Sequence, residues 1–209
     1  MRDHFLFAGA LFAVVISAKA QNAMPYQPTK TLALVQQVCA ACHGLDGNST
    51  RAGVPSLAGQ VEAYLERQLH VFAAQGEQRP NGVMGAIAVN LSADGMKRTS
   101  AYFARQPLRP PSGVAPQQQG RAEGQKIFDA GLREQGIASC ASCHGARGEG
   151  LPDRFPRLAG QHAPYIAEQL RHFRDGSRTS DPQAAMRNVA ARLSDREIDE
   201  VSQYVALLR

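Results

Sequence analysis

Two short motifs contain all four cysteines of the chain, and each motif ends in a histidine. They are Cys39-Ala40-Ala41-Cys42-His43 and Cys140-Ala141-Ser142-Cys143-His144. On a helix, cysteines three positions apart lie about one turn apart. This separation suits the two vinyl groups of a haem, which thiols convert to thioethers, and the next histidine can then bind the iron. The spacing therefore predicts two covalently bound haem c groups, attached through Cys39, Cys42, Cys140 and Cys143.

Three other kinds of site also use paired cysteines. A thioredoxin-like dithiol needs a βαβ setting, for which the sequence gives no pattern. Zinc ribbons pair two CxxC groups within one small unit, whereas these two lie about 100 residues apart. A disulfide within CxxC closes a loop too short to stabilise much, and it leaves the two histidines unexplained. Haem attachment accounts for every cysteine and for both histidines.

The chain is an internal duplication. A shift of 101 residues aligns the two CxxCH motifs and nine further identities within an 18-residue window. These identities pair Pro55, Leu57, Ala58, Gly59, Gln60, Tyr64, Gln68, Leu69 and Phe72 with Pro156, Leu158, Ala159, Gly160, Gln161, Tyr165, Gln169, Leu170 and Phe173. A shift of 102 then aligns Met84 with Met186. A difference of one residue in length therefore falls between Phe72 and Met84.

The duplication also points to the iron ligands. Met84 and Met186 lie 41 and 42 residues after His43 and His144, in stretches with Gly, Pro and Asn that we interpret as loops before the last helix of each unit. We expect His43 with Met84, and His144 with Met186, to be the axial ligands. Met96 aligns with Ile198, which indicates a core residue.

The remaining candidates are less well supported by the repeat. Met24 has no counterpart in the second unit. His70, His162 and His172 do not repeat, and we interpret them as surface or groove residues. Tyr64 and Tyr165 do repeat, which suits either a bond to a haem propionate or simple packing.

The elements around these residues are predicted to be helices. Val61, Leu65, Leu69 and Phe72 keep a spacing of three or four. A capping box from Ser194 to Glu197 predicts the start of the last helix, whose buried stripe would be Ile198, Val201, Val205 and Leu208. No stretch alternates as a strand does, so we predict an all-α fold.

The expected organisation has four parts. Residues 1–20 resemble a signal peptide, with an apolar run too short to cross a bilayer and an Ala-Lys-Ala cleavage site; the alternative is an uncleaved membrane anchor. The first unit is 21–106, a Pro- and Gln-rich linker is 107–119, and the second unit is 120–209. The net charge of +5, or +4 without residues 1–20, comes from scattered basic residues, which argues against nucleic-acid binding.

On these motifs the sequence resembles the cytochrome c4 family of two-haem periplasmic cytochromes, over about residues 25–209. The resemblance implies two tandem class I cytochrome c domains related by a pseudo-twofold axis. It also implies that the carbonyls of Pro55 and Pro156 accept hydrogen bonds from His43 and His144. As partners the resemblance implies a quinol-oxidising complex as electron donor and a haem–copper terminal oxidase as electron acceptor. Some members of the family are loosely associated with the membrane.

Three classes of function are to be weighed for these residues. Iron with both axial positions filled suits a periplasmic carrier of single electrons rather than an enzyme. The alternative is a dihaem subunit of a sulfide- or sulfur-oxidising flavoprotein complex, which the same double domain would also fit. A haem peroxidase or thiosulfate oxidase would need an open or unusually ligated iron, and the two matched methionines argue against it.

Overall fold

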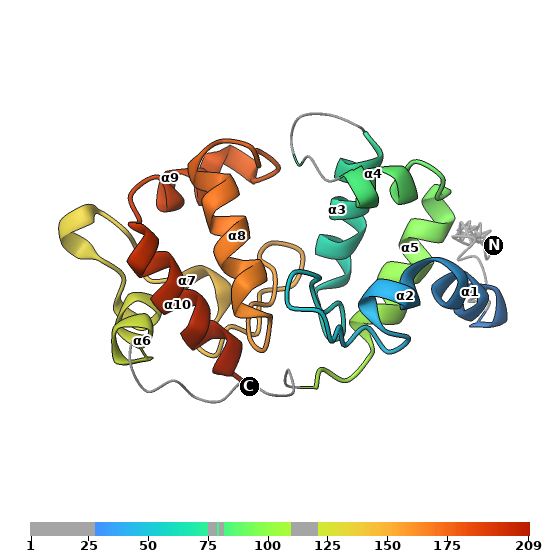
Figure 1. Ribbon diagram of the computed structural model, residues 1–209, viewed down its shortest axis with the longest axis horizontal. Coiled ribbons are helices and arrows are strands. Elements are labelled where there is room, and N and C mark those ends of the chain that lie inside the picture. Colours follow the sequence, from blue (N-terminus) through green and yellow to red (C-terminus); the bar gives the residue numbers. More distant parts are fainter. Residues whose placement is uncertain (1–27, 75–78, 80–81, 110–120) are drawn as a thin grey trace, which may run out of the picture.

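The protein consists of two small helical bundles that lie side by side (Figure 1). The structure is a computed structural model, and it describes residues 28–74, 79, 82–109 and 121–209. Within these ranges there is no β-strand, only two isolated bridges, Leu132 with Ile137 and Leu151 with Phe155. The all-α prediction is thereby confirmed.

The first unit begins with one nearly continuous helix that carries the first CxxCH motif. Helix α1, Pro28–Leu34, passes through a π-helical turn, Val35–Cys39, into α2, Ala40–His43. Helix α3, Glu62–Ala73, packs against both α4, Gly82–Ala88, and α5, Ala93–Ala104. Helix α5 starts at Ser92, whose hydroxyl accepts a hydrogen bond from the Gly95 N–H at 3.1 Å.

The second unit repeats this plan with one inserted loop. It consists of α6, Arg121–Ala130, a 3₁₀ turn, Arg133–Gln135, α7, Ala141–His144, α8, Ala163–Arg174, a second 3₁₀ turn, Pro182–Ala184, α9, Ala185–Ala190, and α10, Asp195–Leu207. Helix α6 does not continue into the CxxCH motif. It ends before Gly131, whose φ of +72° turns the chain into a loop closed by the Leu132–Ile137 bridge. The aligned motifs gave no indication of this loop.

The core of the second unit forms where α10 packs on α6 and α8. Ile198, Val201 and Val205 of the predicted stripe are buried, while Leu208 lies just past the helix and is half-buried. The predicted capping box is present, with Ser194 and Glu197 each bonded to the other's backbone N–H. Gly124 allows the close approach of α6, since a Cβ there would lie 2.2 Å from the Glu200 carbonyl oxygen.

The two units meet through equivalent segments. The Gln161 side chain bonds to both the N–H and the carbonyl of Ser56, each at 2.9 Å. His162 is buried at the same interface, and its Nε2 bonds to the Ser49 carbonyl at 2.9 Å. The interpretation of His162 as a surface or groove residue is therefore wrong. A single sequence shows which segments are equivalent but not which of them meet.

The first residues of the segment that joins the two units are bonded to the first unit. The Pro107 carbonyl and the Arg109 N–H both bond to the Asn48 side chain, at 3.0 and 2.7 Å. The rest of the expected linker, the expected signal peptide and Met24 lie outside the described residues. None of the described helices is long and apolar enough to span a membrane.

Candidate haem-binding sites

Cys39 and Cys140 directly precede the short helices α2 and α7, and Cys42 and Cys143 lie within them. None of the four is paired in a disulfide. Burial raises the pKa of Cys39 and of Cys140 to about 11. A nucleophilic dithiol needs the opposite shift, because the thiolate is the reactive form. The surroundings of these thiols therefore argue against thioredoxin-like redox chemistry.

The two motif histidines are held in the same way. His43 and His144 are buried, and the Nδ1 of each lies 2.9 Å from the carbonyl oxygen of Pro55 or Pro156. Because a carbonyl only accepts hydrogen bonds, Nδ1 must carry the proton. Burial lowers the pKa of both imidazoles, although the proline carbonyl opposes this. Each ring is therefore neutral with the Nε2 lone pair free, which is the state that binds a metal.

Met84 and Met186 lie in helices, not in the loops that we expected. Met84 is in α4 and Met186 is in α9, and both side chains are half-buried. The residues that suggested loops stand at helix starts: Gly82 begins α4, and Pro182, a favoured residue at this position, begins the 3₁₀ turn that leads into α9. Met96 is 3% exposed, as expected of a core residue.

Each unit contains a set of donors of the types that haem c uses. The set contains two thiols about one helical turn apart, a neutral imidazole with one free nitrogen, and a thioether on a separate short helix. In the described part of the chain, no three His, Cys, Asp or Glu side chains are grouped so that they could hold a metal ion. Two thiols, an imidazole and a thioether are the groups that attach and ligate haem c.

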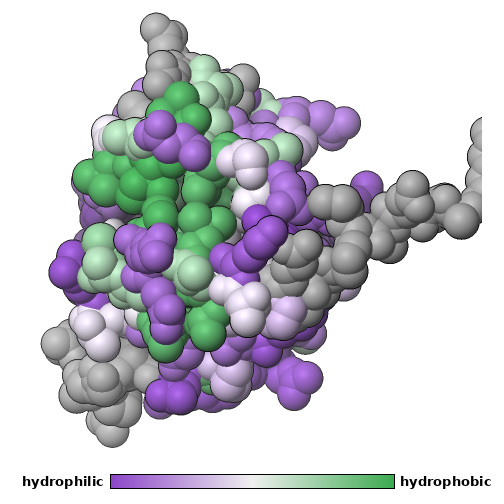
Figure 2. Space-filling model, turned by 90° about the vertical axis from the view of Figure 1, so that its right-hand side faces the viewer, coloured by the Kyte–Doolittle hydropathy of each residue, from purple (hydrophilic) through white to green (hydrophobic). Residues whose placement is uncertain are grey.

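The surroundings of the two sites differ. Met84 lies between Val83 and Gly85, whereas Met186 is followed by Arg187, which is paired with the buried Asp181 at 2.9 Å. Large apolar residues of the first unit are also exposed, among them Leu32, Leu45, Val83 and Val89. Figure 2 views the end of the molecule formed by this unit and shows an apolar surface over one face. The surroundings of Met84 and Met186 are therefore unequal.

Two arginines between the units were not predicted from the sequence. Arg79 and Arg178 bond to the repeated tyrosines, Arg79 to Tyr165 and Arg178 to Tyr64. They are 99 positions apart, so neither the 101 nor the 102 shift aligns them. One sequence signal could have found them. A glycine lies three residues before Arg79, in the segment after Phe72, and another lies two residues before Arg178, in the segment after Phe173.

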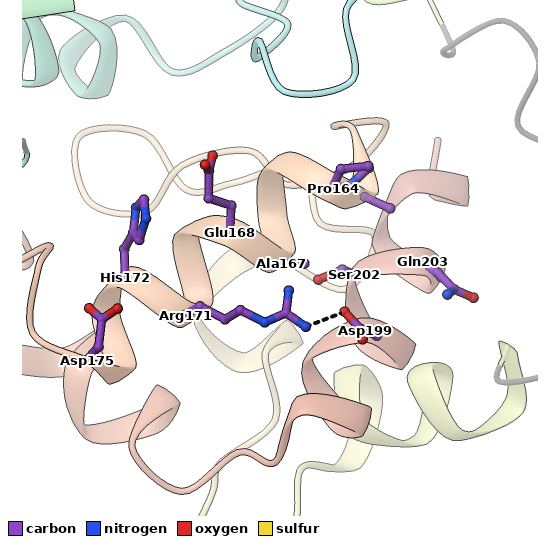
Figure 3. Close-up of a pocket in the computed structure, with 10 residues that line it drawn as sticks. Pro164, Ala167, Glu168, Arg171, His172, Asp175, Asp199, Ser202 and Gln203 are labelled. Atoms are coloured by element: carbon purple, nitrogen blue, oxygen red, sulfur yellow. Dashed lines mark hydrogen bonds and ion pairs between the residues drawn. The ribbon is translucent and has the colours of Figure 1, made fainter. Parts of the chain in front are cut away.

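A shallow pocket lies on the second unit between α8 and α10 (Figure 3). Its lining includes Arg171 and Asp199, which form an ion pair at 2.8 Å, together with Glu168 and His172. None of its lining residues belongs to the donor set of either haem site. We assign no chemistry to it.

Comparison with known proteins agrees with this geometry. The family model for cytochrome c matches residues 29–105 and 121–209. The chain is 40% identical over 177 residues to cytochrome c4 of Azotobacter vinelandii, which covers 80% of this chain and 83% of the relative. This chain belongs to the cytochrome c4 family. The crystal structure of reduced cytochrome c4 from Pseudomonas stutzeri superposes with a TM-score of 0.79 at 36% identity, over 88% of this chain and 99% of the other.

Membership of the cytochrome c4 family settles the cofactor and the general function. The chain carries two covalently bound haem c groups, and its two cysteine pairs fit the attachment motif. It is a dihaem electron-transfer protein. Another relative, 40% identical over 171 residues, is named as a thiosulfate dehydrogenase electron acceptor in Thiomonas intermedia strain K12; the match covers 80% of this chain and 77% of that protein.

Proposed function

We propose that the chain is a periplasmic carrier of single electrons with two closed haem sites. The iron ligands are His43 and Met84 in the first unit, and His144 and Met186 in the second. The observation that supports this most directly is the matched orientation of the histidines, each held at 2.9 Å by a proline carbonyl. Both copies of the duplicated unit keep this contact, and in each it leaves Nε2 free for the same task.

The protein groups around the haem favour transfer over catalysis. Haem supplies one reversible electron per iron when it is bound. The proline carbonyls hold the imidazoles in one tautomer and orientation, and a methionine ligand on each bound haem would leave no iron position for a substrate. A thioether also stabilises ferrous iron and raises the potential. The chain therefore needs redox partners rather than a small substrate.

We further propose the division into a signal peptide at 1–20, domains at 21–106 and 120–209, and a linker at 107–119. The described helices of the two units, which run from Pro28 to Ala104 and from Arg121 to Leu207, support this division. A cleaved signal peptide would place the domains in the periplasm. Mass spectrometry of the secreted protein should give an N-terminus after residue 20; a chain that keeps these residues would instead be anchored.

The donor that we propose is a quinol-oxidising complex, and the acceptor is a haem–copper terminal oxidase. A second donor is supported by a specific finding: a relative that covers most of this chain is named as an electron acceptor of thiosulfate dehydrogenase. Stopped-flow mixing with each purified donor, followed by oxidase turnover, separates these two. Flavin that co-purifies with the chain would instead identify it as the subunit of a sulfide- or sulfur-oxidising flavoprotein.

The ligand assignment is tested on the purified holoprotein. Alkaline pyridine spectroscopy should show two covalent haems per chain, and neither ferrous haem should bind carbon monoxide. Carbon monoxide bound to both haems of the unmodified protein would show that Met84 and Met186 are not ligands.

A further inference from the structure

Arg79 and Arg178 occupy equivalent places in the two units. The guanidinium carbon of Arg79 lies 4.7 Å from the centroid of the Phe72 ring, and that of Arg178 lies 4.3 Å from the Phe173 ring. Phe72 and Phe173 are aligned by the duplication. The difference in length between the units falls in the segment that carries these arginines. Their equivalence is therefore structural, even though their separation in sequence does not show it.

Each arginine reaches across to the other unit. Arg79 donates from Nη2 to the Tyr165 hydroxyl, and to Gln169 Oε1 at 3.1 Å. Arg178 donates from Nη2 to the Tyr64 hydroxyl and to Gln68 Oε1, both at 3.1 Å. Each also donates from Nη1 to the glutamine of its own unit. The six side chains, here called the crossed-arginine cluster, are Tyr64, Gln68, Arg79, Tyr165, Gln169 and Arg178.

The crossed-arginine cluster has two positive charges and no described negative charge. Arg178 is only 5% exposed, and both guanidinium groups share the same two glutamine oxygens. Among the residues that the structure describes, neither arginine has a carboxylate partner. Like charges that are removed from water and bonded only to neutral groups are unfavourable unless an anion joins them.

Two neighbouring groups show how electropositive this place is. Burial by itself would raise the pKa of the Tyr64 phenol, but the charges of Arg178 and Arg79 outweigh it and lower the pKa to about 8. Arg67 lies over the Tyr64 ring, 5.6 Å from its centroid, and its buried Nε has no hydrogen-bond partner in the described part of the chain. A third cation with a free donor is thus directed to the same region.

The crossed-arginine cluster adjoins the methionine helix of each unit. Helix α3, which carries Tyr64 and Gln68, packs against α4, the helix of Met84. Helix α8, which carries Tyr165 and Gln169, packs in the same way against α9, the helix of Met186. Haem c brings two propionate carboxylates to each unit, and planar guanidinium groups bind carboxylates well.

We propose that Arg79 and Arg178 bind haem propionates, that each serves both haems, and that they thereby couple the two reduction potentials. The proposal rests on the dihaem function proposed above. A positive charge beside a haem opposes the ferric state, which is the more positive one, so removal of that charge lowers the potential. Because each guanidinium contacts both units, removal of either one should lower both potentials. An arginine that served only its own unit would affect only one.

The test is a potentiometric titration of the holoprotein and its variants. Arg79→Gln and Arg178→Gln should each lower both reduction potentials, which corresponds to a several-fold smaller equilibrium constant for the reduction of each haem. Arg178→Lys keeps the positive charge, so its two reduction potentials should stay closer to those of the unmodified protein. Arg171→Gln is the matched control, because Arg171 lies on α8, the helix of Tyr165 and Gln169, but pairs with Asp195 and Asp199, and it should change neither potential. A shift of one potential only, or equal shifts in Arg178→Lys and Arg178→Gln, would overturn the proposal.

A second measurement uses only the unmodified protein, in case the arginine variants do not incorporate their haems. Redox-difference infrared spectra of the unmodified protein, with and without ¹⁵N-labelled arginine, should show guanidinium bands that respond during reduction of each haem. No response, or a response to one haem alone, contradicts the coupling. Pyridine spectroscopy on the same samples counts the haems, so loss of the dihaem function is distinguished from loss of the coupling.

Discussion

The side-chain amide of Gln60 in the first unit bonds to the backbone of Arg157 in the second: Oε1 accepts from the Arg157 N–H at 2.7 Å, and Nε2 donates to its carbonyl at 2.9 Å. Gln161 makes the same pair of bonds to Ser56, the residue aligned with Arg157. Both glutamines are buried. The interface is therefore formed twice by the same contact, as a pseudo-twofold axis requires.

These amide pairs should stabilise the docking of the two units. Gln60→Ala removes both bonds and leaves the Arg157 backbone groups unpaired, which should lower the free energy of unfolding by about 1–3 kcal/mol. Gln161→Ala should behave alike. Urea unfolding followed by circular dichroism measures the loss, with Gln203→Ala, an exposed glutamine of α10, as control. Equal stability of Gln60→Ala and the control would show that the contact contributes nothing.

The ligand role of Met186 predicts an open iron when the side chain is shortened. Met186→Ala should let carbon monoxide bind one ferrous haem per chain and should lower the potential of that haem, because the thioether that favours ferrous iron is gone. Visible spectra under carbon monoxide count the open sites. Met96→Leu is the control, since Met96 is a buried core methionine of the same chain and its replacement conserves volume.

The sequence predicted what depends on repetition and on local signals. The CxxCH motifs, the all-α class and the capping box at Ser194 follow from spacing and residue type, and the structure has the last two as expected. The loop after Gly131 was missed because it lies ahead of the aligned motifs, where the repeat gives no register. The loops expected at Met84 and Met186 were wrong because Pro182 stands at the start of a helical turn, where proline is favoured, and because α4 begins at Gly82 in spite of the glycine.

Contacts between the units could not be predicted for a different reason. His162 aligns with Val61, so the repeat marks it as unimportant, yet its ring bonds to the Ser49 carbonyl of the other unit. Arg178 is likewise defined by partners more than 100 positions away. A duplicated sequence states that two units are alike, but the surfaces that they bury against each other depend on tertiary packing.

The close crossing of α6 and α10 predicts that one added methyl group, at position 124, strongly lowers the stability of the second unit. Gly124→Ala would place a Cβ within 2.2 Å of the Glu200 carbonyl oxygen, so the two helices must move apart. Overpacking of this kind costs about 1–3 kcal/mol. Thermal unfolding of the second unit should report it. Gly53→Ala is the control, because a Cβ there meets no atom within 4 Å; a similar loss in both variants would contradict the close crossing.

The acidic end of α10 predicts how stability depends on pH. Asp195 accepts hydrogen bonds from Arg174 at 2.7 Å and from Arg171 at 3.3 Å, and these bonds hold its pKa below the ordinary 3.8. Because the unfolded carboxyl has the higher pKa, it takes up protons first as the pH falls. The contribution of Asp195 is therefore complete well above pH 3.8 and is lost as the pH falls through the lowered value.

Calorimetry from pH 6 to pH 2 on the unmodified protein and on Asp195→Asn tests this dependence. The unmodified protein should melt at the higher temperature by a constant margin near neutral pH, and the margin should shrink in acid, where both proteins carry a neutral side chain at position 195. The side chain is largely exposed, so salt should reduce the margin as well. A margin that stays the same down to pH 2 would mean that the ion pairs of Asp195 do not stabilise α10, and that the capping box alone fixes where this helix begins.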